Sequence, residues 1–196
     1  GNEYPIDSYF YECLLPYNNK VLEVKDMLNV IAFSSCNEVI SKLYKKIFAH
    51  ELSAYEVKAK LKSKEISEEH INLVISFLKS EGHLKEEDFI NHYKEIYQYK
   101  KGYKAFKRFL ESKHISDYSI NKAMLSYNEN EEYVYEYANK FIKSKTNSNK
   151  MIKAKLIASL TNKGFSSEVI NKVIDKLEFD DDIINLKKEI VKYVKK

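Results

Sequence analysis

The residues best suited to chemistry in this sequence form a basic and aromatic stretch, KEIYQYKKGYKAFKRF. Cationic groups neutralise phosphates and aromatic rings stack on bases, so their alternation predicts contact with a nucleic acid. An alternative interpretation is that Phe106, Phe109 and Leu110 form core while the cations are an ordinary solvated face, and both remain open. The candidate binding residues here are Lys100, Lys101, Lys104, Lys107, Arg108, Tyr97, Tyr99 and Tyr103.

Two further lysine groups occupy comparable places earlier and later in the chain. They are Lys58, Lys60, Lys62 and Lys64, and Lys150, Lys153 and Lys155. A continuous basic seam along all three groups would indicate a polyanion-binding surface, whereas separate patches would not. The net charge of +4 permits such a partner without requiring one. An acidic, tyrosine-rich stretch that includes Glu129 is a second candidate contact, for a basic partner.

Catalytic, metal-binding and cofactor-binding patterns are not found in the sequence. The five histidines are dispersed and form neither His-x-x-x-His nor His-Glu-x-x-His, although zinc needs three or four convergent ligands. Phosphate loops, nucleophile elbows and dinucleotide-binding turns are absent. The acidic clusters at Glu86–Asp88 and Asp180–Asp182 begin predicted helices, where carboxylates complement the helix dipole. We therefore expect no catalytic residue, no metal site, no cofactor and no enzyme activity.

Composition favours a helical protein inside the cell. With 4 glycines and 2 prolines in 196 residues, few positions break helices. Two cysteines, Cys13 and Cys36, fit free thiols in a reducing compartment. Neither a run of about 18 uncharged apolar residues nor a signal-peptide pattern occurs. These features predict a cytoplasmic protein without a membrane association.

The arrangement of apolar residues repeats along the chain. Ile66, Ile115 and Phe165 are 49 and 50 residues apart, and the apolar residues around each of them align. Their spacing predicts that Val57, Leu61, Leu156 and Val173 face the core. Each copy is too small to bury its own apolar face, so the copies must stack. Ser53 with Glu56 predicts a capping box, and Ser67, Ser116 and Ser166 follow the three aligned positions as helix caps.

The predicted fold is all-α, with three tandem three-helix repeats in an elongated, curved array. One helix precedes the array, after a short irregular or strand-containing segment, and a final helix is expected to begin at Asp180. The predicted organisation is an N-terminal segment at 1–35, a leading helix at 36–50, and repeats at 51–100, 101–147 and 148–196. We expect a monomer.

Several motifs resemble those of the RecX family, the regulators of the bacterial RecA recombinase. NKGFSSEVINKVIDKL is similar to the family's Lys-Gly-Phe/Ile, cap, x-x-x-Ile, x-x-x-Leu pattern, and SKHISDYSINKAML and SKEISEEHINLVISFL are weaker copies. SEGHLKEEDF and KKGYKAFKRFL match two further family segments in the expected order. The resemblance covers roughly residues 36 to 196 and rests on the ordered set.

The chain also departs from the family pattern. Lys85 and Glu86 replace an Asp pair, and Glu65 and His114 stand where the family prefers glycine. Arg108 is the only arginine. The N-terminal segment is shorter than the β extension of many longer relatives.

The resemblance implies a binding function. Relatives lie in the groove of the RecA filament on single-stranded DNA and hinder filament growth, ATP turnover and strand exchange. The expected partners are therefore the RecA filament and single-stranded DNA, reached directly or through RecA, in DNA recombination, repair and the SOS response. Two alternatives remain open: a stand-alone nucleic-acid-binding helical repeat protein, and a helical scaffold that joins two proteins.

Overall fold

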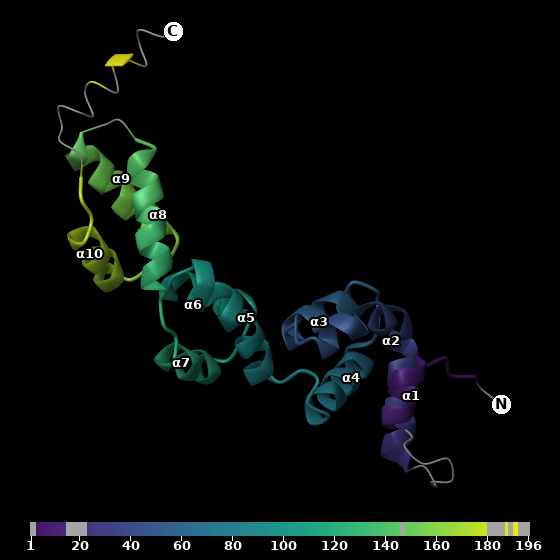
Figure 1. The fold of residues 1–196 in the computed structure, drawn as a ribbon. Coiled ribbons are helices and arrows are strands. Elements are labelled where there is room, and N and C mark those ends of the chain that lie inside the picture. Colours follow the sequence, from purple (N-terminus) through teal and green to yellow (C-terminus); the bar gives the residue numbers. More distant parts are fainter. Residues whose placement is uncertain (1–2, 15–22, 146–147, 180–186, 188–189, 192–196) are drawn as a thin grey trace. The chain divides into compact units, whose positions relative to one another are not determined.

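A computed structural model describes residues 3–14, 23–145, 148–179, 187 and 190–191, and this part of the chain contains helices and no strand (Figure 1). Ten helices follow one another in it: α1 (Ser8–Leu14), α2 (Val24–Phe48), α3 (Ala54–Lys62), α4 (Glu68–Ser80), α5 (Glu86–Lys100), α6 (Tyr103–Ser112), α7 (Asp117–Leu125), α8 (Glu131–Lys143), α9 (Asn149–Asn162) and α10 (Ser167–Asp175). The predicted all-α class is confirmed. The helix expected from Asp180 lies outside the described residues.

The chain forms two compact units. Unit 1 comprises residues 1–93 and 113–119, and unit 2 comprises residues 94–112 and 120–196. Each unit has a core of its own, which is built from α1 to α4 in unit 1 and from α8 to α10 in unit 2. Among the described residues, no helix is long and apolar enough to span a bilayer.

The N-terminal segment differs from the irregular or strand-containing prediction. It contains α1, and α2 begins at Val24 rather than at residue 36, with Glu23 and Asp26 forming a capping box. Phe10 of α1 is 1% exposed, and its ring lies 5.2 Å from that of Phe33. Burial against α2 therefore decides the structure of a segment whose local pattern was ambiguous.

The core of unit 1 lies between α2, α3 and α4. Val57 and Leu61 of α3 are fully buried, as predicted from their spacing, and Phe33 packs edge-on against Phe77 of α4 with ring centroids 5.2 Å apart. The predicted capping box is present, because Ser53 Oγ accepts a hydrogen bond from the Glu56 amide while the Glu56 carboxylate accepts one from the Ser53 amide.

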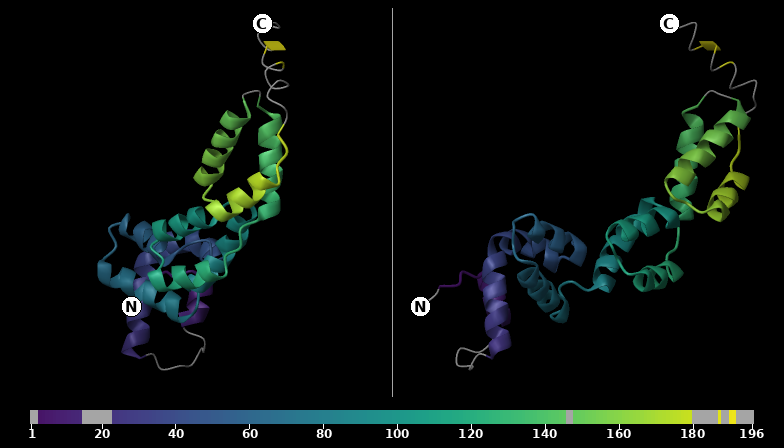
Figure 2. Two further views of the ribbon diagram at one scale, coloured as in Figure 1. Left: turned by 90° about the vertical axis from the view of Figure 1, so that its left-hand side faces the viewer. Right: turned by 180° about the vertical axis from the view of Figure 1, so that it is seen from behind.

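In unit 2, α8, α9 and α10 pack together as one group (Figure 2). Their shared core includes Val134 of α8, Leu156 of α9 and Val173 of α10, each 1% exposed or less. In unit 1 the corresponding group is α2, α3 and α4. The first helix of each group, α2 or α8, lies before the predicted start of the corresponding repeat, which was residue 51 for the first group and residue 148 for the second. Spacing alone does not show where a repeated unit begins, because a periodic pattern can be divided at any helix.

Three aligned turns use the left-handed region of backbone space. Glu65, His114 and Gly164 have φ of +57°, +53° and +88° and follow α3, α6 and α9. Glycine adopts this conformation without steric cost, whereas a residue with a Cβ is strained there. The preference for glycine at these positions therefore has a backbone cause, and Glu65 and His114 carry the strain.

Candidate nucleic-acid interface

The turn between α5 and α6 is held in place by close backbone contacts within unit 2. The Gly102 amide donates to the Lys163 carbonyl at 3.1 Å, and the Lys104 amide donates to the Gly164 carbonyl at 2.9 Å. A Cβ at Gly102 would lie 2.2 Å from the Phe165 Cα. Only glycine fits such a contact, so this turn has one defined position relative to the α9–α10 turn.

Tyr127 also holds this turn in place. Its ring stacks on Phe106 with centroids 5.0 Å apart, and its hydroxyl donates to the Lys101 carbonyl at 2.9 Å. Burial raises the pKa of the Tyr127 hydroxyl well above its ordinary value, and the nearby Glu129 carboxylate raises it further. The phenol therefore remains a hydrogen-bond donor, and the main chain at Lys101 is fixed.

The side chains around this turn form what we call the basic corner, which consists of Tyr99, Lys100, Lys101, Tyr103, Lys104 and Arg108. The corner's four cations are exposed, and none of them has a carboxylate within 4.0 Å among the described residues. Lys107 is half-buried and lies 4.0 Å from Glu111. A cluster of unneutralised cations attracts polyanions.

The tyrosines of this stretch have two different environments. Tyr99 and Tyr103 are 62% and 36% exposed, which leaves ring surface available for stacking. Tyr97 instead stacks on Phe109 with centroids 4.7 Å apart and contacts Phe106 at 5.3 Å. Phe106 and Tyr97 thus pack inward while the cations and two tyrosines face solvent, and contact of this stretch with a nucleic acid stays a prediction.

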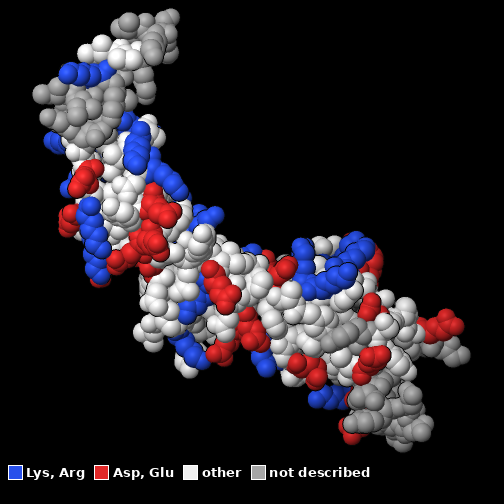
Figure 3. All heavy atoms as spheres, in the orientation of Figure 1, with Lys and Arg blue, Asp and Glu red and all other residues white. Residues whose placement is uncertain are grey.

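Lysines of α3 and of the turn after it are mostly paired with acids of unit 1. Lys58 and Lys62 lie 2.7 and 3.0 Å from the carboxylate of Glu68, and Lys64 lies 3.7 Å from that of Glu38. Lys60 has no such partner among the described residues. Figure 3 shows lysine side chains gathered over α3 and the adjoining part of α2. Exposed pairs of this kind contribute about 0–1 kcal/mol each and reduce the local positive potential.

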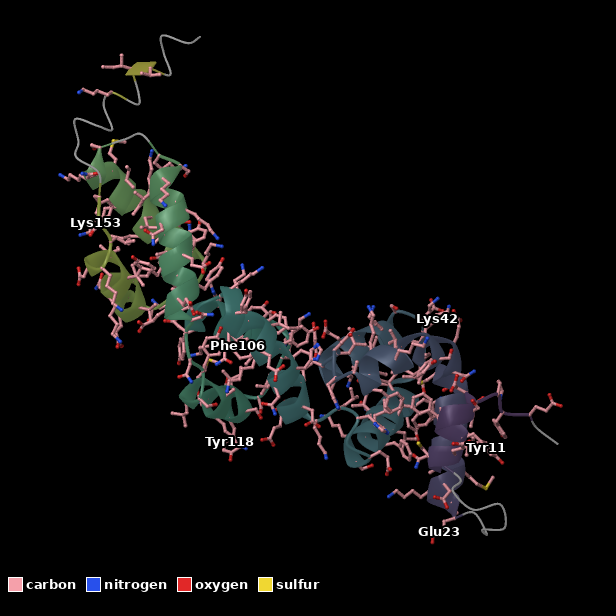
Figure 4. The ribbon with its side chains drawn as sticks, in the orientation of Figure 1. Tyr11, Glu23, Lys42, Phe106, Tyr118 and Lys153 are labelled. Atoms are coloured by element: carbon pink, nitrogen blue, oxygen red, sulfur yellow. The ribbon has the colours of Figure 1, made fainter. Side chains whose placement is uncertain are left out.

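The third lysine group lies on α9, a helix without an acidic residue. Lys150, Lys153 and Lys155 are all exposed, and Figure 4 shows Lys153 on the outer side of unit 2. The three predicted groups thus belong to different units, with α3 in unit 1 and the other two in unit 2. A continuous basic seam stays a prediction.

Two carboxylates have roles that the sequence did not reveal. The Glu129 carboxylate accepts hydrogen bonds from the amides of Tyr103 and Ser166 at 2.7 and 3.0 Å, and from the Ser166 hydroxyl. It therefore fixes the start of α6 and the cap of α10, whereas the sequence placed it among candidate partner contacts. The sequence signal that could have revealed this role is the serine cap that recurs in each copy, because a capping serine can also donate to a nearby carboxylate.

Glu86 plays the equivalent part in unit 1. Its carboxylate accepts hydrogen bonds from the Ser116 amide at 3.1 Å and the Ser116 hydroxyl at 2.6 Å. Burial raises the pKa of the Glu86 carboxyl, but hydrogen bonds from Ser116 and Ser119 outweigh it and hold the pKa below its ordinary value. The group is thus an ionised anchor for the start of α7.

The described residues contain no group of three or more His, Cys, Asp or Glu side chains that could hold a metal ion. What the geometry does provide is a fixed turn surrounded by exposed cations and two tyrosines. Fold and surface together define an all-α protein of three-helix groups with an exposed basic and aromatic patch in unit 2.

Comparison with known proteins gives matches to one family. A model of the family domain "RecX, third three-helix domain" matches residues 129–174, which contain α8, α9 and most of α10. Regulatory protein RecX of Staphylococcus haemolyticus is 28% identical over 178 residues, covering 87% of this chain and 67% of that protein. Its Staphylococcus saprophyticus counterpart is 27% identical over 165 residues, covering 82% of this chain and 60% of that protein.

Solved structures agree. The crystal structure of RecX from Lactobacillus salivarius has a TM-score of 0.60 and 27% identity, and the match covers 71% of this chain and 97% of that one. A crystal structure of regulatory protein RecX has a TM-score of 0.65 at 18% identity, covering 84% and 87%, which is a likeness of fold. The family model, the two relatives and the solved structures together support a RecX family protein.

Proposed function

We propose that this protein is a cytoplasmic, non-enzymatic regulator that binds the RecA recombinase and its single-stranded DNA filament. It inhibits ATP hydrolysis, filament extension and strand exchange in DNA recombination, repair and the SOS response. Membership of a family whose relatives are named regulatory proteins supports this role. The chain spans about two thirds of the length of those relatives or less, so its activity is proposed for the residues present here.

The basic corner is the observation that carries the proposal. Lys100, Lys101, Lys104 and Arg108 have no acidic partner among the described residues, and the turn that bears them is fixed by Tyr127 and Gly102. A preorganised cluster binds phosphates with little loss of conformational freedom. Lysines in both units then add weak contacts, which raise affinity through effective concentration.

The test measures RecA-dependent ATP hydrolysis on single-stranded DNA. We expect substoichiometric protein to slow hydrolysis, and the double substitution Lys101→Ala/Lys104→Ala to raise the concentration needed about tenfold, since each charge-assisted contact contributes roughly 1 kcal/mol or more. Lys140→Ala/Lys143→Ala, on α8, is the matched control and should inhibit like the parent chain. Unchanged hydrolysis at a large molar excess of the parent chain would reject the proposal.

The basic corner also favours a second candidate, direct binding to nucleic acid without RecA. In that case binding to a single strand should weaken with salt, with a slope near −0.7 per phosphate contact on logarithmic axes. The Lys101→Ala/Lys104→Ala variant should then lose about 1.4 from that slope. Binding that does not depend on salt, together with unchanged RecA hydrolysis, would leave the scaffold alternative.

A further inference from the structure

Unit 1 contains a cleft of about 390 Å³ to which the proposed function assigns no ligand. Its wall is formed by α3, α4, the start of α5 and the turn before α7, all within unit 1. The polar side chains that line it include Tyr55, Lys58, Lys79, Glu86, Lys113 and His114. This volume falls within the range of small-molecule sites.

Two turns of unit 2 touch each other through their backbones. The aligned turns of unit 1 have side chains between them, and the cleft lies there. Repeat spacing aligns Ser53 with Gly102 and His114 with Gly164. In unit 2 the two glycines allow backbone contact, and a Cβ at Gly164 would lie 2.4 Å from the Ala105 amide nitrogen. In unit 1 the Tyr55 ring instead lies against the His114 ring, with centroids 3.8 Å apart.

The charges on the cleft wall favour an anion. Lys58, Lys79 and Lys113 line it, while Glu86 is the only carboxylate among its lining residues. The carboxylate of Glu86 is already occupied by the amide and hydroxyl of Ser116.

The acidic partners of these lysines lie outside the lining. Lys58 is paired with Glu68, and Lys113 is paired with Glu56. Lys79 has no carboxylate within 4.0 Å among the described residues. An anion entering the cleft would therefore meet three cations, one of them without an ion-pair partner, and ammonium groups bind phosphate strongly.

Tyr55 supplies an aromatic surface beside these cations. Its side chain is 48% exposed although one side is covered by His114. Stacking of a base on an aromatic side chain does not depend strongly on the base. A nucleotide has a base, which can stack on an aromatic ring, and a phosphate, which cations can bind. The cleft wall offers both kinds of group.

We propose that the unit 1 cleft binds a nucleoside phosphate, with the phosphate among Lys58, Lys79 and Lys113 and the base on Tyr55. This site is separate from the basic corner and goes beyond RecA regulation. The ligand comes from one of two sources: a free nucleotide or one nucleotide of a single strand.

The test is a titration of the full chain with adenosine monophosphate, adenosine and a short oligothymidylate, followed by amide and His114 ring NMR signals. We expect the phosphate-bearing ligands to shift signals of residues 53–58 and 113–116. Lys79→Ala should weaken this binding about tenfold, because it removes one charge-assisted contact. Lys46→Ala, an exposed lysine of α2 outside the cleft, is the matched control and should bind like the parent chain.

Shifts with the mononucleotide identify a free nucleotide as the ligand, and shifts with the oligothymidylate alone identify a nucleotide within a strand. Either result supports the cleft as a nucleotide site. Equal binding of adenosine and adenosine monophosphate would overturn it, as would shifts confined to residues 99–108. Tyr55→Leu, which keeps an apolar side chain at an exposed position, should reduce the affinity of the nucleotide but not that of inorganic phosphate.

Discussion

The α9–α10 turn of unit 2 and the aligned α6–α7 turn of unit 1 reach similar backbone conformations with different chemistry. Gly164 touches the main chain at Ala105, and the turn is sealed by backbone hydrogen bonds to Gly102 and Lys104. His114 makes a ring contact with Tyr55 instead, and the neighbouring Lys113 pairs with Glu56. The two glycines of unit 2 allow the turns to touch, whereas Ser53 and His114 at the aligned positions of unit 1 border a cleft.

The comparison teaches that the carboxylate anchor is the shared part of the two turns. Glu86 holds Ser116, and Glu129 holds Ser166, in each case through both the amide and the hydroxyl of the serine. The anchor is present in both turns, although the close backbone contacts of Gly102 and Gly164 occur only in unit 2. Substitution at each turn therefore separates the contribution of the anchor from that of the glycines.

Gly164→Ala should have the largest effect. The added Cβ would clash with the Ala105 main chain, and φ of +88° is strained for alanine, so we expect unit 2 to lose about 3 kcal/mol of stability. Urea denaturation measures this loss. His114→Ala in unit 1 is the matched change and should cost about 1 kcal/mol, since it removes only a ring contact. Equal losses would show that the two turns do not differ as described.

Glu129→Gln should rank second, with a loss of about 2 kcal/mol. The carboxylate accepts hydrogen bonds from two amides and a hydroxyl, and charge-assisted bonds to such a group contribute more than neutral ones. Glu86→Gln should cost less, about 1 kcal/mol, because the Glu86 carboxylate accepts a hydrogen bond from one main-chain amide rather than two. Urea denaturation of both variants gives the order, and a larger loss at Glu86 would contradict it.

Stability of unit 1 should fall when the pH drops below the ordinary His pKa of 6.5. Burial lowers the pKa of His83, which contacts Phe48, so the unfolded chain binds a proton at higher pH than the folded one does. Stability is then fully present above pH 6.5 and decreases as the pH falls toward the folded pKa. His83→Gln should flatten the profile between pH 7 and 5. The Glu86 contribution is lost only at more acidic pH, below the ordinary Glu pKa of 4.5.

Glu65→Gly should have the smallest effect and opposite sign. Residue 65 is exposed and has φ of +57°, so glycine removes backbone strain, and we expect a gain of about 0.5–1 kcal/mol after the entropy cost of glycine. His114→Gly relieves similar strain but loses the Tyr55 contact, so the net change should be close to zero. Thermal unfolding of the two variants compares them, and a clear gain for His114→Gly would mean that the ring contact contributes little.

Much of the fold was predictable because helices and caps are local. Spacing placed Val57, Leu61, Leu156 and Val173 in the core, and Ser53 was recognised as a capping box from four residues of sequence. The sequence also shows the basic stretch around Gly102, but it does not show that Tyr97 packs inward. Side-chain direction on a helix of mixed composition depends on what packs against it, which the sequence does not state.

Long-range contacts account for what was missed. The first residues were expected to be irregular or strand-containing, but α1 forms there with Phe10 packed against Phe33, and a local pattern cannot show such a partner. The bond from Glu129 to Ser166 spans 37 residues, and the sequence offered a plausible surface role for the same glutamate. Neither error came from a wrong propensity, since both segments satisfy their local rules.

The sequence by itself determined that this protein is all-helical, that its apolar pattern recurs at 49 and 50 residues, and that its motifs match one family. These properties depend on periodicity and on neighbours within a few residues, which the order of amino acids states directly. Only the tertiary structure decided how the copies divide into three-helix groups, which lysines lack acidic partners, and where a cleft opens. Those features depend on distances between segments that are far apart in the chain, and close packing fixes such distances only once the whole core has formed.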